Sequence, residues 1–186
     1  MTVAAILLAA GKSTRFDANK LMHPLDGKPL ALHSAASLKA AFPDALAVVS
    51  PGSPLRALLE AQGMATVVSE RAHEGMGESL KTAVEAVRDA DGWIVALADM
   101  PFIRPETHSR IAQALKDGAT IAAPSYRGER GHPVGLSARF RDELLALSGD
   151  AGARFIIKAH ANEIELIEVD DPGVIKDIDT PADLEP

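Results

Sequence analysis

The chain begins with an uncharged apolar run, residues 3–10, that ends at Gly11. An apolar run of this kind predicts a strand that is buried on both faces, as the strands of parallel sheets are. Gly11 then predicts a turn at which backbone N–H groups lie close to a ligand. Two cationic side chains, Arg15 and Lys20, follow within ten residues. Together these features predict a site for an anionic group, such as a nucleotide phosphate.

Composition limits the fold class and the partners. The 186 residues are 47% hydrophobic but only 4% aromatic, which indicates a core of Ala, Val, Leu and Ile between helices and strands. The net charge of −7 argues against a nucleic-acid-binding surface, although a few local cations still attract a small anion. The absence of cysteine excludes disulfides, thiolate nucleophiles and cysteine-ligated metal sites.

The length predicts one domain, residues 1–186. The first eleven residues lack a basic leader, and their apolar run is too short to span a bilayer. We therefore expect a soluble, cytoplasmic protein that binds neither membranes nor nucleic acid.

Apolar runs alternate with helical patterns along the chain. This alternation predicts an α/β fold with a mainly parallel, doubly wound sheet and helices on both faces. Ligands bind beyond the carboxyl ends of the strands in such sheets, where Gly11 and Asp99 fall. The predicted strands are residues 3–8, 45–49, 65–68, 93–97, 120–123 and 164–169. The predicted helices are residues 29–42, 53–61, 78–90 and 105–115, while 126–133 is expected to be a charged loop and 142–161 largely helical.

Two acidic positions are candidate metal ligands. Asp99 directly follows the fourth predicted strand, and Pro101 ends the strand pairing there. A carboxylate in that place suits Mg²⁺, which prefers one or two carboxylates together with substrate phosphates. In a second acidic segment, alternation puts Asp177 and Asp179 on the same side, and one of them is a candidate second ligand. The alternative for Asp99 and for Asp179 is the capping of a helix or a turn.

The other candidate residues also have ordinary alternatives. The loop after the first strand has neither the P-loop pattern nor G-x-G-x-x-G, so a plain turn with surface cations stays open. Arg130, His132 and Arg154 are candidates for binding an anionic second substrate. A surface loop, or a helix start capped by Asp150, explains them equally well.

Five motifs occur in a fixed order along the chain. They are Leu8-Ala9-Ala10-Gly11-x-Ser13-x-Arg15 with Lys20, Asp99-Met100-Pro101, Gly131-His132-Pro133, Gly149-Asp150-x-Gly152-Ala153-Arg154 and Asp179-Thr180-Pro181-x-Asp183-Leu184. The set resembles the molybdenum-cofactor cytidylyltransferases, a branch of the nucleotidyltransferase superfamily with a Rossmann-like three-layer α/β/α fold. The first two motifs are shared across the superfamily, whereas the third and fourth point to the molybdopterin branch.

The resemblance implies an Mg²⁺-dependent enzyme that transfers CMP from CTP to molybdopterin and releases pyrophosphate. Ala10 favours CTP, because relatives that use GTP tend to carry glycine there. The implied catalytic residues are Arg15, Lys20 and Asp99; the implied nucleotide-binding residues are Leu8, Ala9, Ala10, Gly11, Ser13, Gly75, Gly77 and Ser79; the implied metal ligands are Asp99 and Asp179; and the implied acceptor-binding residues are His132 and Arg154.

Other functions stay open at this stage. One is a cytidylyltransferase acting on a sugar- or polyol-phosphate such as 2-C-methyl-D-erythritol 4-phosphate, and another is a guanylyltransferase of the molybdenum cofactor. A non-enzymatic carrier of the finished cofactor is the alternative from a different class. The expected partners are CTP and molybdopterin, with a client molybdenum oxidoreductase as a further candidate.

Overall fold

The computed structural model describes residues 1–11, 19–179 and 183, and it confirms the predicted α/β fold with a mainly parallel sheet. Among these residues, eight strands form one sheet in the order β10-β7-β9-β6-β1-β4-β5, with β8 paired to β7. A short hairpin, β2–β3, lies apart from it. The strands are β1 (Val3–Ala9), β2 (Pro24–Leu25), β3 (Lys28–Pro29), β4 (Leu46–Val49), β5 (Ala65–Val68), β6 (Gly92–Leu97), β7 (Ile121–Tyr126), β8 (Glu129–Arg130), β9 (Val134–Ser137) and β10 (Ile164–Glu168).

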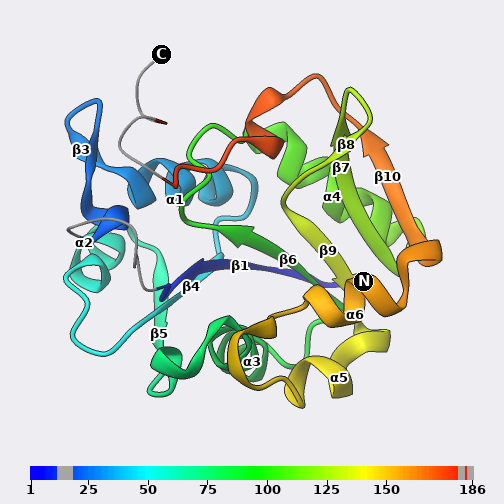
Figure 1. Ribbon diagram of the computed structural model, residues 1–186, viewed down its shortest axis with the longest axis horizontal. Coiled ribbons are helices and arrows are strands. Elements are labelled where there is room, and N and C mark those ends of the chain that lie inside the picture. Colours follow the sequence, from blue (N-terminus) through cyan, green and yellow to red (C-terminus); the bar gives the residue numbers. More distant parts are fainter. Residues whose placement is uncertain (12–18, 180–182, 184–186) are drawn as a thin grey trace.

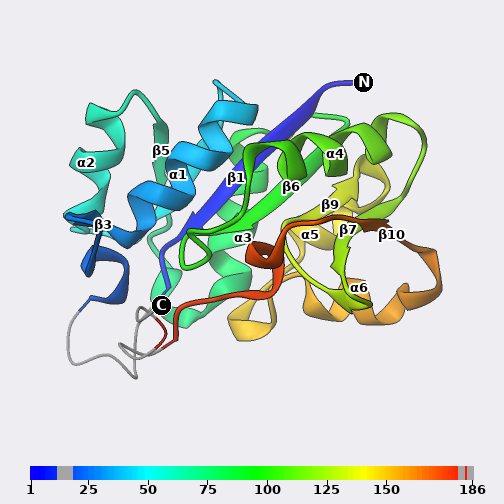
Figure 2. The same ribbon diagram turned by 90° about the horizontal axis from the view of Figure 1, so that it is seen from above.

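Helices cover both faces of the sheet (Figures 1 and 2). In Figure 1, α1 and α4 lie above the sheet, whereas α3 and α5 lie below it. The helices are α1 (Leu30–Ala41), α2 (Leu55–Ala61), α3 (Met76–Ala86), α4 (Pro105–Lys116), α5 (Arg141–Leu145) and α6 (Arg154–Ala159). Short 3₁₀ turns are η1 (Lys20–Met22), η2 (Ala72–Glu74), η3 (Ala138–Phe140), η4 (Gly149–Ala151), η5 (Ala161–Glu163) and η6 (Pro172–Ile175).

Strand β1 lies inside the sheet, between β6 and β4, and contributes side chains to both layers of the core. Its alternate side chains face opposite sides. Ala5, Leu7 and Ala9 pack into the layer that contains buried residues of α1, α2 and α4. Ile6 and Leu8 pack into the layer formed with α3, α5 and α6. An apolar run without alternation is therefore what this position requires.

Strand β9 interrupts the parallel order and was not predicted from the sequence. It pairs antiparallel with both β6 and β7. Its four residues include Gly135, which weakens the sequence signal for a strand. That glycine has a packing reason, since a Cβ there would lie 2.9 Å from Cγ2 of Ile111 on α4. The predicted charged loop, residues 126–133, also contains β8, which pairs with β7.

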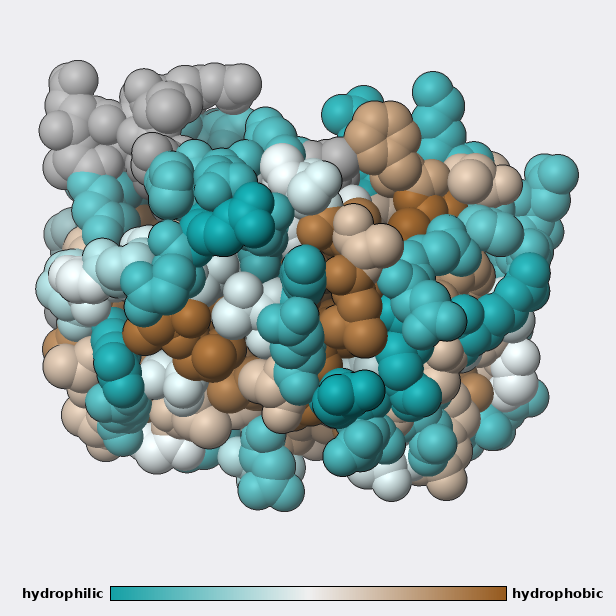
Figure 3. All heavy atoms as spheres, turned by 90° about the horizontal axis from the view of Figure 1, so that it is seen from below, coloured by the Kyte–Doolittle hydropathy of each residue, from teal (hydrophilic) through white to brown (hydrophobic). Residues whose placement is uncertain are grey.

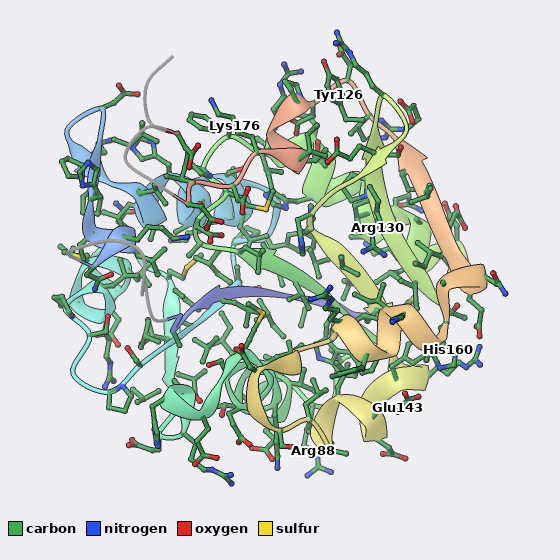
Figure 4. All side chains as sticks on the ribbon, in the orientation of Figure 1. Arg88, Tyr126, Arg130, Glu143, His160 and Lys176 are labelled. Carbon is green, nitrogen blue, oxygen red and sulfur yellow. The ribbon has the colours of Figure 1, made fainter. Side chains whose placement is uncertain are left out.

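The segment predicted as largely helical, residues 142–161, contains two separate short helices. Gly149 and Gly152 take φ angles of +62° and +51°, a left-handed conformation that ends helical continuity between α5 and α6. His160, which follows α6, lies next to α5: its Nε2 is 4.0 Å from Oε1 of Glu143 (Figure 4). Its Nδ1 is 2.8 Å from Oε1 of Glu163 in η5.

The surface on the α3 and α5 side is mixed in character. Figure 3 shows this face, on which apolar patches are separated by hydrophilic side chains. None of the helices in the described part of the chain has both the length and the hydropathy that a membrane crossing requires.

Candidate active site

A cavity of about 550 Å³ opens at the carboxyl end of the central strands. This volume is in the usual range for small-ligand sites. It lies where doubly wound sheets bind their ligands, beyond the ends of β1 and β6. The lining residues are Leu8, Ala10, Gly11, Lys20, Leu21, Ala72, His73, Glu74, Gly75, Met76, Ser79, Leu97, Asp99 and Asp150.

Lys20 joins two carboxylates from distant parts of the chain. Its Nζ donates to Oδ2 of Asp99 at 2.9 Å and to Oδ1 of Asp179 at 3.1 Å. The Lys20 side chain is 12% exposed and the Asp99 side chain 25%, whereas Asp179 is 47% exposed, so the Lys20–Asp99 pair is the better shielded of the two. Burial opposes the charge of Lys20, but the hydrogen bonds and charges of Asp99 and Asp179 outweigh burial. The pKa of Lys20 is therefore raised above its ordinary value of 10.5.

The two carboxylates suit a divalent cation. One oxygen of each carboxylate lies close to the Lys20 ammonium. A metal ion bound at or near that position would be within reach of both carboxylates. Among the described residues no group of three or more His, Cys, Asp or Glu side chains has a metal-binding arrangement. Two carboxylates are nevertheless enough for Mg²⁺, which takes its other ligands from water and substrate phosphates.

The segment that carries Asp179 is held against the site by backbone contacts. The Ile178 N–H donates to the Asp99 carbonyl at 3.0 Å. Further back, buried Asp171 accepts hydrogen bonds from the Arg104 N–H and the Thr107 hydroxyl at the start of α4. These contacts explain how a residue 159 positions from Lys20 in sequence reaches it.

His132 lies close enough to Asp99 for the two side chains to interact electrostatically. Its N–H donates to the Val174 carbonyl at 2.9 Å, and its Nδ1 is buried without a hydrogen-bond partner among the described residues. Burial lowers its pKa; the nearby Asp99 opposes this effect, and Arg130 (Figure 4) adds to it. The imidazole is therefore neutral at neutral pH.

The cavity includes several of the residues predicted to bind a nucleotide. Leu8, Ala10, Gly11, Gly75 and Ser79 line it. Ala9 and Gly77 are not part of the lining: Ala9 points into the core, and Gly77 packs on the backbone of residues 148–149. Ser13 and Arg15 lie outside the described residues.

Two residues of the Gly-Asp-x-Gly-Ala-Arg motif lie differently with respect to the cavity. Arg154 is exposed at the start of α6 and does not line the cavity. Asp150 lines it instead, at the end formed by α3. The signal that was missed is the pair of glycines, Gly75 and Gly77, which permits the close approach of Asp150.

Comparison with known proteins identifies the family. Residues 5–164 match the MobA-like NTP transferase domain. The chain belongs to this family. As a MobA-like NTP transferase domain it is a nucleotidyltransferase, and its cavity, Lys20 and carboxylate pair lie at the sheet edge where this fold class binds ligands.

Relatives of this MobA-like domain include proteins of similar and of greater length. It is 30% identical to the purine catabolism protein PucB of Bacillus subtilis over 96% of this chain and 92% of that protein. It is 34% identical to the bifunctional protein GlmU of Roseobacter denitrificans over 65% of this chain, a match that spans only 28% of GlmU.

Solved structures agree with the fold. Rv0371c of Mycobacterium tuberculosis superposes with a TM-score of 0.83 and 26% identity, covering 98% of this chain and 94% of that one. A second structure of Rv0371c, in complex with manganese, superposes with a TM-score of 0.81 and 26% identity, covering 98% and 96%. A divalent cation is thus present in a protein of this fold.

Proposed function

We propose that residues 1–186 form one domain that transfers CMP from CTP to molybdopterin and releases pyrophosphate. The observation that carries the proposal is the convergence of Asp99 and Asp179 on Lys20 beside the cavity. This arrangement provides a cation and a metal-binding carboxylate pair where a triphosphate has to be held. The resemblance of the motifs to molybdenum-cofactor cytidylyltransferases supports the choice of acceptor.

The proposed reaction needs no nucleophile from the protein. A terminal phosphate oxygen of molybdopterin attacks the α-phosphorus of CTP, a new P–O bond forms, and the bond to the β-phosphate oxygen breaks. Pyrophosphate leaves with that electron pair. A phosphate monoester is largely doubly ionised at neutral pH, so the attacking oxygen needs no general base. The protein contributes positioning and neutralisation of charge.

Each residue then has a defined task. Lys20, together with Arg15 from outside the described residues, neutralises the phosphates. Asp99 and Asp179 would hold Mg²⁺, which when bound stabilises the charge that develops on the phosphate oxygens. The manganese complex of the similar protein Rv0371c supports a divalent ion here.

The remaining motif residues would contact the nucleotide or the acceptor. Ala10 and Gly11 would face the nucleotide, with Ala10 favouring CTP over GTP. His132 and Arg154 would bind the molybdopterin side, and the neutral imidazole of His132 would then act as a hydrogen-bonding group rather than as a cation. A cytoplasmic location and delivery of the product to a molybdenum oxidoreductase complete the proposal.

The experiment that tests the proposal is a matrix of pyrophosphate-release assays. CTP, GTP, ATP and UTP are each offered with molybdopterin or with 2-C-methyl-D-erythritol 4-phosphate, in the presence of Mg²⁺. We expect turnover with CTP and molybdopterin. Turnover only with methylerythritol phosphate, or only with GTP, would replace the proposed substrate. No turnover with any pair, combined with tight binding of the finished dinucleotide cofactor, would favour a carrier.

A further inference from the structure

Asp150 lines the cavity, yet the transfer reaction proposed above gives it no task. We propose that the Asp150 carboxylate accepts a hydrogen bond from the nucleoside part of the bound nucleotide and thereby helps to select it. This inference rests on the proposed function, because it takes the occupant of the cavity to be a nucleotide.

The backbone that carries Asp150 is packed directly on the first turn of α3. A Cβ at Gly75 would overlap the backbone N and Cα of Asp150, and a Cβ at Gly77 would lie 2.8 Å from the Gly149 carbonyl oxygen. On the other side of Asp150, a Cβ at Gly152 would lie 3.2 Å from Sδ of Met76. Because contacts fix the loop on both sides of Asp150, the backbone that places its side chain at the cavity is set before a ligand arrives.

The charge of Asp150 is available for a ligand. Its side chain is exposed and forms no hydrogen bond or ion pair with another residue in the described ranges. Its neighbour in the cavity wall, Glu74, is instead paired with Arg71 at 2.6 Å. An ionised carboxylate only accepts hydrogen bonds, and it repels phosphates. The complementary group on a nucleotide is therefore a neutral donor.

Asp150 and Lys20 reach the cavity from opposite layers of the molecule. Lys20 belongs to η1, which contacts α1 above the sheet in Figure 1, whereas η4 contacts α3 below it. With the phosphates near Lys20, the nucleoside extends toward α3 and Asp150. The neutral donors of the cytidine part are its ribose hydroxyls and the exocyclic amino group of cytosine. Both offer the same chemistry to a carboxylate.

Nucleotide analogues can separate these two donors. Calorimetric titration in Mg²⁺ would compare CTP with 2′-deoxy-CTP and 2′,3′-dideoxy-CTP, which lack hydroxyls, and with UTP, which lacks the amino group. A hydrogen bond to a charged acceptor is worth about tenfold or more in affinity. We expect the wild type to show this preference for CTP over at least one analogue, and Asp150→Ala to reduce that ratio to near one.

Two further variants make the experiment specific. Asp150→Asn keeps an acceptor oxygen but loses the charge, so an intermediate ratio is expected. Asp142→Ala removes an exposed carboxylate on α5 outside the cavity and should leave all ratios unchanged. If Asp150→Ala weakens every nucleotide equally, or if the wild type discriminates against none of the analogues, the assignment is wrong.

Pyrophosphate release by the wild type, measured in parallel, separates this inference from the proposed function. Release that persists while the ratios are the same in wild type and Asp150→Ala overturns only the role of Asp150. No binding and no release with any nucleotide overturns the proposed function and the role of Asp150 together.

Discussion

The Nζ of Lys20 lies 2.9 Å from Oδ2 of Asp99, although the two residues are 79 positions apart in the sequence. The same ammonium also contacts Asp179, so one cation balances two carboxylates. Without that cation, the two carboxylates would be a stronger site for a divalent ion, because one positive charge that repels a second cation there would be gone.

We therefore expect Lys20→Gln to bind Mn²⁺ more tightly than the wild type when no nucleotide is present, by about tenfold. Pyrophosphate release should fall in the same variant, since the phosphates lose a cation. Electron paramagnetic resonance of free Mn²⁺ measures the affinity. Lys28→Gln, an exposed lysine on β3, is the control and should behave as the wild type. Equal Mn²⁺ affinity in Lys20→Gln and wild type would show that the ammonium does not compete with the metal.

Asp99→Asn tests the metal assignment. The substitution keeps the shape of the side chain but removes the charge, so turnover should fall by at least about a hundredfold while the fold is retained. Asp179→Asn should have a smaller effect in the same direction, because its side chain is more exposed. The control is Asp177→Asn, an exposed carboxylate in the same segment. Full turnover by Asp99→Asn would remove Asp99 from the list of metal ligands.

His108 gives the stability of the protein a defined pH dependence. It is 2% exposed on α4, and burial lowers its pKa to about 4, with Asp171 opposing the shift. The unfolded chain, with a pKa near 6.5, binds a proton first as the pH falls, so the free energy of unfolding decreases between pH 6.5 and 4. The loss at pH 4.5 amounts to about 2 to 3 kcal/mol.

The variant His108→Gln cannot titrate and should lose less stability between pH 7.5 and 4.5 than the wild type, as measured by urea denaturation. The comparison uses the difference between the two pH values, so a uniform change in stability does not affect it. His73→Gln, at an exposed position, should keep the wild-type difference. An unchanged difference in His108→Gln would assign the acid sensitivity to other groups.

The sequence predicts the central part of the fold and site well, because those features depend on local pattern. The apolar run of β1 and the position of Asp99 after β6 are each visible within about ten residues. The partnership of Lys20 with Asp179 spans 159 positions and depends on how the C-terminal segment packs. Strand β9 is short and contains Gly135, so its place between β6 and β7 follows from tertiary packing rather than from propensity.

Gly131 determines how closely the segment that carries Asp179 approaches the sheet. A Cβ at this position would overlap the carbonyl oxygen of Val174, which also accepts the His132 N–H. Gly131→Ala should therefore displace η6 and lower the free energy of unfolding by about 2 kcal/mol. Mn²⁺ affinity should fall as well, because Asp179 follows η6 and would leave its place beside Asp99.

Gly128→Ala is the matched control, three residues earlier on the β7–β8 turn. Nothing lies within 4 Å of a Cβ there, and the only cost is its φ of +83°, about 1 kcal/mol. This variant should lose some stability but no Mn²⁺ affinity, since a Cβ at Gly128 would displace no neighbouring segment. Loss of Mn²⁺ affinity in Gly131→Ala alone would separate the position of the Asp179 segment from general destabilisation. Equal Mn²⁺ affinity in the two variants would mean that the contact between Gly131 and Val174 does not position Asp179.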